Sequence, residues 1–165
     1  MKKQLAAFLF VVLSPLFFVA CVSSILKEKA PTFSSEVSFV PPAEPFQVLN
    51  KSVFPSWKNR ASGNVLSILS DCQPGNPASF HDLHNMIEDS VDSPFIVTET
   101  WITFQKKPAL QRLIRAELDG SPLEVRSLAF KRLNCGYIIS LSGKPEQLKV
   151  DQSAFDFFLK SLSFK

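Results

Sequence analysis

Three long stretches in the second half of the chain have the residue pattern of β-strands and follow one another directly. Residues 95–105 are rich in β-branched and aromatic side chains, and residues 110–118 and 123–133 flank Asp119-Gly120. An Asp-Gly pair is a strong signal for a two-residue hairpin turn. Strands joined by a turn this short pair in antiparallel fashion. The pattern therefore predicts a meander, in which strands that are neighbours along the chain are neighbours in the sheet.

Further strands are expected before and after this meander. Short runs of apolar and β-branched residues predict strands at 46–49, 52–58, 65–72 and 137–142. The last of these follows a turn expected at Asn134-Cys135-Gly136. The sheet should therefore include strands from both halves of the domain.

Two helices are expected, each with one apolar face. Ser79, followed three residues later by Asp82, has the pattern of a helix-capping box, and Asp151 can cap a second helix at 151–162. The apolar faces carry Phe80, Leu83, Ile87 and Val91 in the first helix and Phe155, Phe158, Leu159 and Leu162 in the second. Strands, a helix, antiparallel strands and a terminal helix predict an α+β fold, an antiparallel meander sheet packed by helices.

The N-terminus has the features of an export signal that ends in a cysteine. Lys2 and Lys3 precede an apolar run from Leu5 to Ala20, and Cys21 follows. A run of about 16 residues is short for a transmembrane helix, which needs about 20. The Phe-Val-Ala-Cys sequence at its end resembles the lipobox of a bacterial lipoprotein. That resemblance implies that residues 1–20 are a signal peptide and that Cys21 carries the lipid, with fatty acyl groups such as palmitate.

The segment after the cysteine is expected to be a tether. Residues 22–45 are rich in proline and lack a sustained hydrophobic period, so they should connect Cys21 to a domain at 46–165. Within this tether, Ser38-Phe39-Val40 can lie against the domain. Val22 occupies the position at which Asp is associated with inner-membrane retention in some bacteria. The lipoprotein resemblance therefore implies the outer membrane, with the domain facing the periplasm.

Cys72 and Cys135 remain as a pair once Cys21 is assigned to the lipid. Their wide spacing does not resemble a CxxC metal or redox motif. An exported chain reaches a compartment that permits disulfides, so we expect Cys72 and Cys135 to be joined. The alternative is two buried free thiols, because cysteine packs well as a small hydrophobic residue.

Several packing and turn signals are spread along residues 46–165: Trp57, the helix led by Ser79, the Leu118-Asp119-Gly120 hairpin, Gly136-Tyr137, Phe155-x-x-Phe158 and Ser163-Phe164. In these features the chain resembles the fold shared by the photosystem II extrinsic protein PsbP and a Ran-binding nuclear import factor. The resemblance implies a PsbP-like α/β/α sandwich. Because these features are packing and turn signals, neither a manganese-cluster role nor a Ran contact is carried over.

Charge and glycine content argue against several classes of function. The formal net charge is +3, and Lys2 and Lys3 supply two of these charges. Residues 21–165 therefore offer no electrostatic basis for binding nucleic acid. The five glycines form neither GxGxxG nor GxxxxGK[ST], which would hold the phosphates of a nucleotide. We expect no cofactor and no nucleic-acid partner.

The two histidines do not form a recognisable metal or catalytic site. His81, His84 and Glu88 have a helical spacing that can gather ligands on one side. We favour the alternative that they form the solvated surface of the first helix, opposite Phe80 and Leu83. A catalytic nucleophile needs a base within reach, and the sequence contains no GxSxG or CxxC motif. We therefore expect neither a metal site nor an enzyme.

Two tryptophans and two arginines are the candidates for contacts with a ligand or a partner. Trp57 and Trp101 can be either core anchors or exposed aromatic contacts. Arg112 and Arg126 belong to basic strands that can face an anionic ligand or partner surface. The alternative is ion pairing between strands, because acidic residues such as Glu124 are close in the sequence.

These features favour a non-catalytic, membrane-anchored lipoprotein of the bacterial cell envelope that binds another envelope protein or assists the assembly of a complex. The alternative is a periplasmic lipoprotein that binds a small molecule or a glycan through Trp101 with Arg112 or Arg126. A concave pocket lined by Trp and Arg would favour the ligand-binding protein. A flat exposed apolar patch would favour the protein partner.

Overall fold

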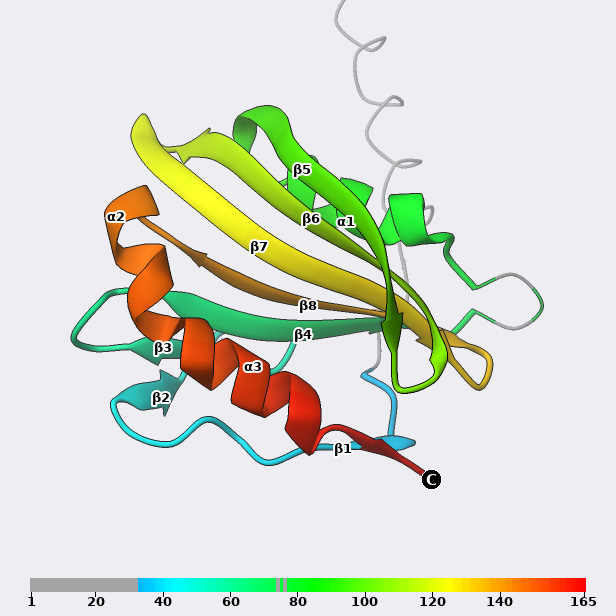
Figure 1. Cartoon of the computed structure of the whole chain (residues 1–165). Coiled ribbons are helices and arrows are strands. Elements are labelled where there is room, and N and C mark those ends of the chain that lie inside the picture. Colours follow the sequence, from blue (N-terminus) through cyan, green and yellow to red (C-terminus); the bar gives the residue numbers. More distant parts are fainter. Residues whose placement is uncertain (1–32, 74, 76) are drawn as a thin grey trace, which may run out of the picture. The chain divides into compact units, whose positions relative to one another are not determined.

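The computed structural model describes residues 33–73, 75 and 77–165, which fold around a seven-stranded sheet (Figure 1). The strand order is β2-β3-β4-β8-β7-β6-β5, and each neighbouring pair is antiparallel. The strands are β2 (Phe46–Val48), β3 (Ser56–Asn59), β4 (Val65–Asp71), β5 (Asp92–Phe104), β6 (Lys107–Leu118), β7 (Ser121–Arg132) and β8 (Cys135–Gly143). The predicted antiparallel meander is therefore confirmed for β5 to β8. The strand expected at 52–58 is shorter and begins only at Ser56.

The meander is connected by tight turns whose residues adopt positive φ. Asp119 and Gly120 have φ of 50° and 71°, as the predicted hairpin between β6 and β7 requires. The turn before β8 has its positive φ at Leu133, with 54°. Cys135, which was expected in this turn, is instead the first residue of β8, opposite Arg132. The strand therefore begins earlier than its apolar residues indicated.

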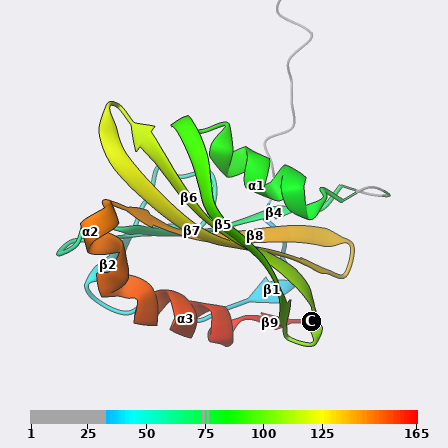
Figure 2. The ribbon, with the colours of Figure 1, turned by 45° about the horizontal axis from the view of Figure 1, so that its top comes forward.

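Helices cover both faces of the sheet, which confirms the α/β/α arrangement (Figure 2). On one face lies α1 (Phe80–Glu88), whose predicted capping box is present between Ser79 and Asp82. On the other face lie α2 (Pro145–Leu148), the short 3₁₀ helix η1 (Lys149–Asp151) and α3 (Gln152–Ser161). Neither α2 nor η1 was expected from the sequence.

Asp151 does not cap α3 as predicted. It occupies the N-cap position, but its side chain makes no capping hydrogen bond. Its carboxylate instead accepts hydrogen bonds from the amides of Asn59 and Asn64, at 2.7 and 2.8 Å, and from the Ser62 hydroxyl. This buried network joins the turn between β3 and β4 to the start of α3.

The packed part of the chain begins before the expected domain boundary at Phe46. The strand β1 (Val37–Ser38) pairs with β9 (Ser163–Phe164) at the end of the chain. Phe33 and Phe39 pack against the core. Within the expected tether, Phe33, β1 and Phe39 therefore pack against the domain, as expected for Phe39. Residues 1–20 and Cys21 lie outside the described residues.

Each face of the sheet has its own apolar core. The core under α3 contains the largest aromatic residues, including Trp57, Phe130, Tyr137, Phe155 and Phe158. The core under α1 is smaller and aliphatic, made of Leu83, Ile87, Ile114, Val125, Ala129 and Ile138. The first seven residues of β8 are buried because one face of this strand contacts the core under α3 and the other face contacts the core under α1. Alternation of side chains along each strand supplies both cores at once.

A disulfide joins Cys72 and Cys135, as expected, with their Cα atoms 4.2 Å apart. Asp71 pairs with Gly136 in antiparallel fashion, so Cys72, the residue after Asp71, lies opposite Cys135, the residue before Gly136. The bond therefore links the end of β4 to the start of β8. Among the described residues, the helices are too short or too polar to cross a membrane.

Candidate functional site

Trp57 belongs to the core and is not available to a partner. Only 5% of its surface is exposed, and its ring centroid lies 5.5 Å from that of Phe158 and 5.6 Å from that of Phe39. Of the two roles open for this residue, the structure shows the core anchor.

Trp101 is exposed and lies on the face of the sheet that α1 covers. Its exposed fraction is 53%, and it makes an edge-to-face contact with Phe80 of α1 at 5.1 Å. It pairs with Leu110, which belongs to the face that α1 covers, whereas Arg126 pairs with Leu113. Because residues 110 and 113 of one strand point to opposite faces, Trp101 and Arg126 cannot form one site. The Trp–Arg pocket of the ligand-binding alternative is therefore not formed by Trp101 and Arg126.

Arg112 is held in a buried ion-pair network. It is 5% exposed, its Nε donates to Glu99 Oε2 at 2.5 Å, and its Nη1 donates to Glu88 Oε1 at 2.6 Å. The hydrogen bond from Arg112 and its positive charge lower the pKa of the Glu99 carboxyl. Arg112 therefore ties α1 and β5 to β6, and both carboxylates occupy its donors.

His84 is buried, contrary to the expected solvated surface. It is 0% exposed, its Nε2 donates to the Leu110 carbonyl at 3.1 Å, and its Nδ1 accepts from the Ser127 hydroxyl at 3.1 Å. Burial lowers its pKa from 6.5 to about 4. Although Ser127 and His84 resemble a nucleophile and its base, Ser127 is also 0% exposed, so a substrate cannot reach this pair.

The side chains of His81, His84 and Glu88, whose helical spacing could gather ligands on one side, do not converge. His81 is exposed and lies 3.9 Å from Glu99, His84 points into the core, and Glu88 binds Arg112. No group of three His, Cys, Asp or Glu side chains is placed to hold a metal ion within residues 33–73, 75 and 77–165.

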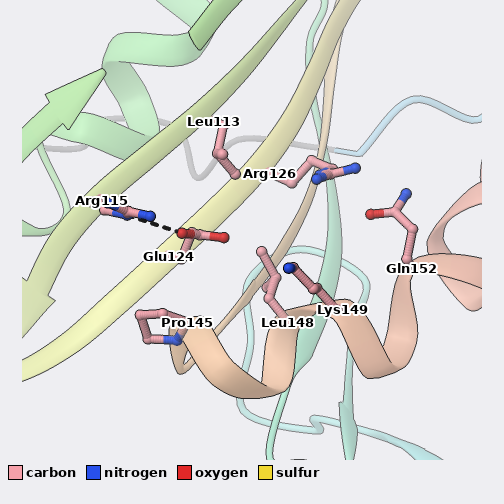
Figure 3. Close-up of a pocket in the computed structure, with 8 residues that line it drawn as sticks. All are labelled: Leu113, Arg115, Glu124, Arg126, Pro145, Leu148, Lys149 and Gln152. Atoms are coloured by element: carbon pink, nitrogen blue, oxygen red, sulfur yellow. Dashed lines mark hydrogen bonds and ion pairs between the residues drawn. The ribbon is translucent and has the colours of Figure 1, made fainter. Parts of the chain in front are cut away.

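A cleft of about 270 Å³ opens between β6–β7 and the segment from α2 to α3 (Figure 3). The strands contribute Leu113, Arg115, Glu124 and Arg126, and the helical segment contributes Pro145, Leu148, Lys149 and Gln152. Arg115 Nε donates to Glu124 Oε2 at 3.1 Å, so one of the expected cross-strand ion pairs is present. The hydrogen bonds of Asp151 with Asn59 and Asn64 hold the helical wall of the cleft in place, because Asp151 lies between the lining residues Lys149 and Gln152.

A second hollow of about 190 Å³ lies beside the cleft on the same sheet. Its lining includes Thr98, Thr100 and Gln111, together with Leu113 and Arg126, which also line the first cleft. Arg126 therefore stands between two hollows on the sheet.

Sequence reasoning identified Arg126 but missed Lys149 and Gln152. The region between β8 and the helix expected at 151–162 was assigned no element, so nothing placed the Lys149 side chain, and Gln152 in the expected helix had no opposite wall to face. One available signal was Pro145, because proline is favoured in the first turn of a helix. A short helix there would have predicted that the chain folds back over the sheet.

The strand β5 forms an open edge of the sheet. It is thirteen residues long, and within the described part of the chain only β6 pairs with it. Most of its residues are exposed, including the large apolar side chains of Phe95, Ile96, Trp101 and Ile102. Such an edge offers free main-chain donors and acceptors to another strand.

Comparison with known proteins identifies the fold. No family model matches the chain, and no curated protein matches its sequence. PsbP of the cyanobacterium Synechocystis sp. PCC 6803 (CyanoP) is 10% identical, with a TM-score of 0.56 over 81% of this chain and 91% of that chain. A Pseudomonas aeruginosa protein of unknown function is 16% identical, with a TM-score of 0.50 over 81% and 87%. LpqN, involved in cell envelope biogenesis of Mycobacterium tuberculosis, is 10% identical, with a TM-score of 0.42 over 82% of each chain. The predicted PsbP-like fold is confirmed by the first of these structures.

Proposed function

We propose that this chain is a membrane-anchored lipoprotein of the bacterial cell envelope whose domain binds another envelope protein without catalysing a reaction. The anchor is inferred from the sequence, in which an apolar run of export-signal length ends at Cys21. Residue 22 is Val, so we assign the protein to the outer membrane with its domain in the periplasm.

The single observation that supports a protein partner is the open edge of β5. Among the described residues, β5 pairs with β6 alone, with a regular register from Thr98 to Phe104, and Phe95 is 67% exposed. Exposed aromatic and β-branched side chains on a long edge strand are normally covered or interrupted, because they promote pairing with other chains. An extended segment of a partner with apolar side chains at alternate positions would add one strand to this sheet.

The non-catalytic role is supported by the positions of the acid–base groups. His84 is enclosed in the core and its two ring nitrogens are occupied, while Glu88 and Glu99 are engaged by Arg112. The cleft contains one carboxylate, Glu124, which is paired with Arg115. These groups act in the stability of the fold.

Site-specific crosslinking in cells tests the partner surface. A photoreactive phenylalanine analogue is placed at Trp101 on β5 and, as a matched control, at Phe157, an aromatic residue of α3 that is 57% exposed. We expect a discrete crosslinked envelope protein from position 101 and not from position 157, identified by mass spectrometry. Equal products from both positions, or none from position 101, would reject β5 as the partner surface.

Fractionation tests the anchor separately. Cys21→Ser removes the thiol that would be acylated, so the variant should lose the mass of the lipid and leave the membrane fraction. An unchanged mass and unchanged fractionation would contradict the lipoprotein assignment and leave the β5 surface untouched.

A further inference from the structure

The charges that line the cleft are unbalanced. Arg115 and Glu124 neutralise each other across β6 and β7 at 3.1 Å. Arg126 and Lys149 remain, and within the described part of the chain no carboxylate lies within ion-pair distance of either. Gln152, which also lines the cleft, donates a hydrogen bond of 2.8 Å to Asp156. The cleft therefore carries two positive charges without acidic partners.

The positions of Arg126 and Lys149 favour a bound anion in the cleft over water. Arg126 is half-buried on the sheet, and Lys149 approaches from the opposite wall (Figure 3). Two like charges facing one partly enclosed space repel each other, and a bound anion replaces this repulsion with two attractions. A guanidinium also presents paired N–H donors in the geometry that phosphate and carboxylate oxygens accept.

The remaining lining describes the rest of the ligand. Leu113, Leu148 and Pro145 give the cleft an apolar surface beside the charged groups. Its volume of about 270 Å³ lies just under the range of about 300 to 1,000 Å³ typical of drug-sized ligands. A ligand that fills it is small and combines an anionic group with a short apolar portion.

We infer that this cleft binds a small organic phosphate monoester, with Arg126 and Lys149 holding the phosphate and Leu113, Leu148 and Pro145 contacting the apolar portion. The doubly negative phosphate matches the two unpaired positive charges, whereas a carboxylate neutralises only one. The site is independent of the β5 edge proposed for the protein partner.

Calorimetric titration of the full-length protein in detergent tests the site. Phenyl phosphate is the probe, with benzoate as the singly charged comparison and benzyl alcohol as the neutral one. We expect phenyl phosphate to bind more tightly than benzoate, and benzyl alcohol not to bind. Arg126→Gln and Lys149→Gln should each weaken phenyl phosphate about tenfold, which is typical for the loss of one charge-assisted contact.

Matched controls separate this site from general attraction to positive charge. Arg60→Gln and Lys160→Gln remove exposed basic residues outside the cleft and should leave the affinity unchanged. If circular dichroism shows that Arg126→Gln unfolds, the affinity of Lys149→Gln tests the site, because Lys149 is exposed and its replacement should not disturb the fold. Absence of binding by phenyl phosphate, or equal weakening by the control variants, would overturn the inference.

The source of the phosphate is distinguished with vesicles. Phosphatidic acid carries a phosphate monoester in its headgroup, so vesicles of phosphatidylcholine with and without phosphatidic acid are compared for displacement of phenyl phosphate. Displacement that requires phosphatidic acid and Arg126 assigns the site to a lipid headgroup. Binding of phenyl phosphate without such displacement assigns it to a soluble phosphate monoester.

Discussion

Gly143 and Asn64 lie so close that a methyl group at position 143 would overlap the Asn64 side-chain amide and come within 2.8 Å of its Cγ. Asn64 is fully buried, and its Nδ2 donates to the Gln147 carbonyl and to Asp151 Oδ2, at 2.8 Å each. Its Oδ1 is buried without a hydrogen-bond partner among the described residues. The absence of a side chain at position 143 therefore keeps the Asn64 amide in place for Asp151.

Gly143→Ala should destabilise the domain by about 1 to 3 kcal/mol, the usual cost of overpacking a filled interior. The methyl group would push the Asn64 amide away from Asp151. Chemical denaturation of Gly143→Ala, Asn64→Ala and the double variant provides the measurement. If the Asn64 amide is the group displaced, the double variant will lose clearly less stability than the two single losses combined. Simple additivity would show that the contact is not the cause.

Phe158→Ala should cost about 3 to 5 kcal/mol, as truncation of a fully buried aromatic ring does. Phe158 is 0% exposed and contacts Trp57 and Phe39 with ring centroids 5.5 and 5.2 Å apart. Phe157→Ala is the matched control, because this adjacent ring is 57% exposed and should change the stability little. Thermal melting of both variants checks the packing of α3, and similar melting temperatures for the two would contradict it.

Acid should weaken the fold through His84. The pKa of His84 is lowered to about 4, so between pH 6.5 and 4 the unfolded chain binds a proton there that the folded chain does not. Its contribution to the free energy of unfolding is therefore present above pH 6.5 and decreases by about 3 kcal/mol as the pH falls to 4. Urea denaturation across this range measures the slope.

Two variants assign this pH dependence to one residue. His84→Gln removes the buried titrating group and should flatten the slope between pH 6.5 and 4. His81→Gln changes the exposed histidine of the same helix and should keep it. If the free energy of unfolding of His84→Gln still falls with pH between 6.5 and 4 as in the unmodified protein, a group other than His84 causes the pH dependence.

Arg112→Met should destabilise the domain by about 2 kcal/mol, because Glu88 and Glu99 lose their common partner. This is below the usual cost of breaking a buried pair, since the Glu99 side chain is 34% exposed and water screens its charge. Replacing Glu88 and Glu99 by Gln in the same variant should recover more than half of the loss.

A second arginine provides the control for Arg112. The Arg115 side chain is 62% exposed and pairs with one glutamate, Glu124, whose side chain is 11% exposed, so its replacement by Met should cost less than that of Arg112. Equal losses at positions 112 and 115, measured by denaturation, would contradict the difference that burial is expected to make.

The sequence was most informative where structure depends on near neighbours in the chain. The Asp119-Gly120 turn and the Ser79 capping box are local, and both were predicted correctly. The disulfide between Cys72 and Cys135 was also anticipated, because an exported chain with two remaining cysteines offers few alternatives.

The sequence was misleading where a side chain depends on partners that are distant in the chain. His84 lies next to Leu83 on the helix and could have been solvated; it is buried because the Ser127 hydroxyl and the Leu110 carbonyl are there to bind it. Asp151 has the pattern of a helix cap, but its carboxylate accepts hydrogen bonds from Asn59 and Asn64 at the turn after β3. The cleft could not be predicted for the same reason, since its two walls meet only after the chain folds back over the sheet.

The pairing of β1 with β9 places two distant parts of the chain side by side. The backbone N–H of Lys165 donates to the Glu36 carbonyl at 3.0 Å. A short linker could therefore join Lys165 to the residues just before β1, and new ends could be opened at the exposed Asp119-Gly120 turn. The domain is thus suited to circular permutation. A reporter fused to the new chain ends would lie at the turn between β6 and β7 and not beside the β1–β9 pair.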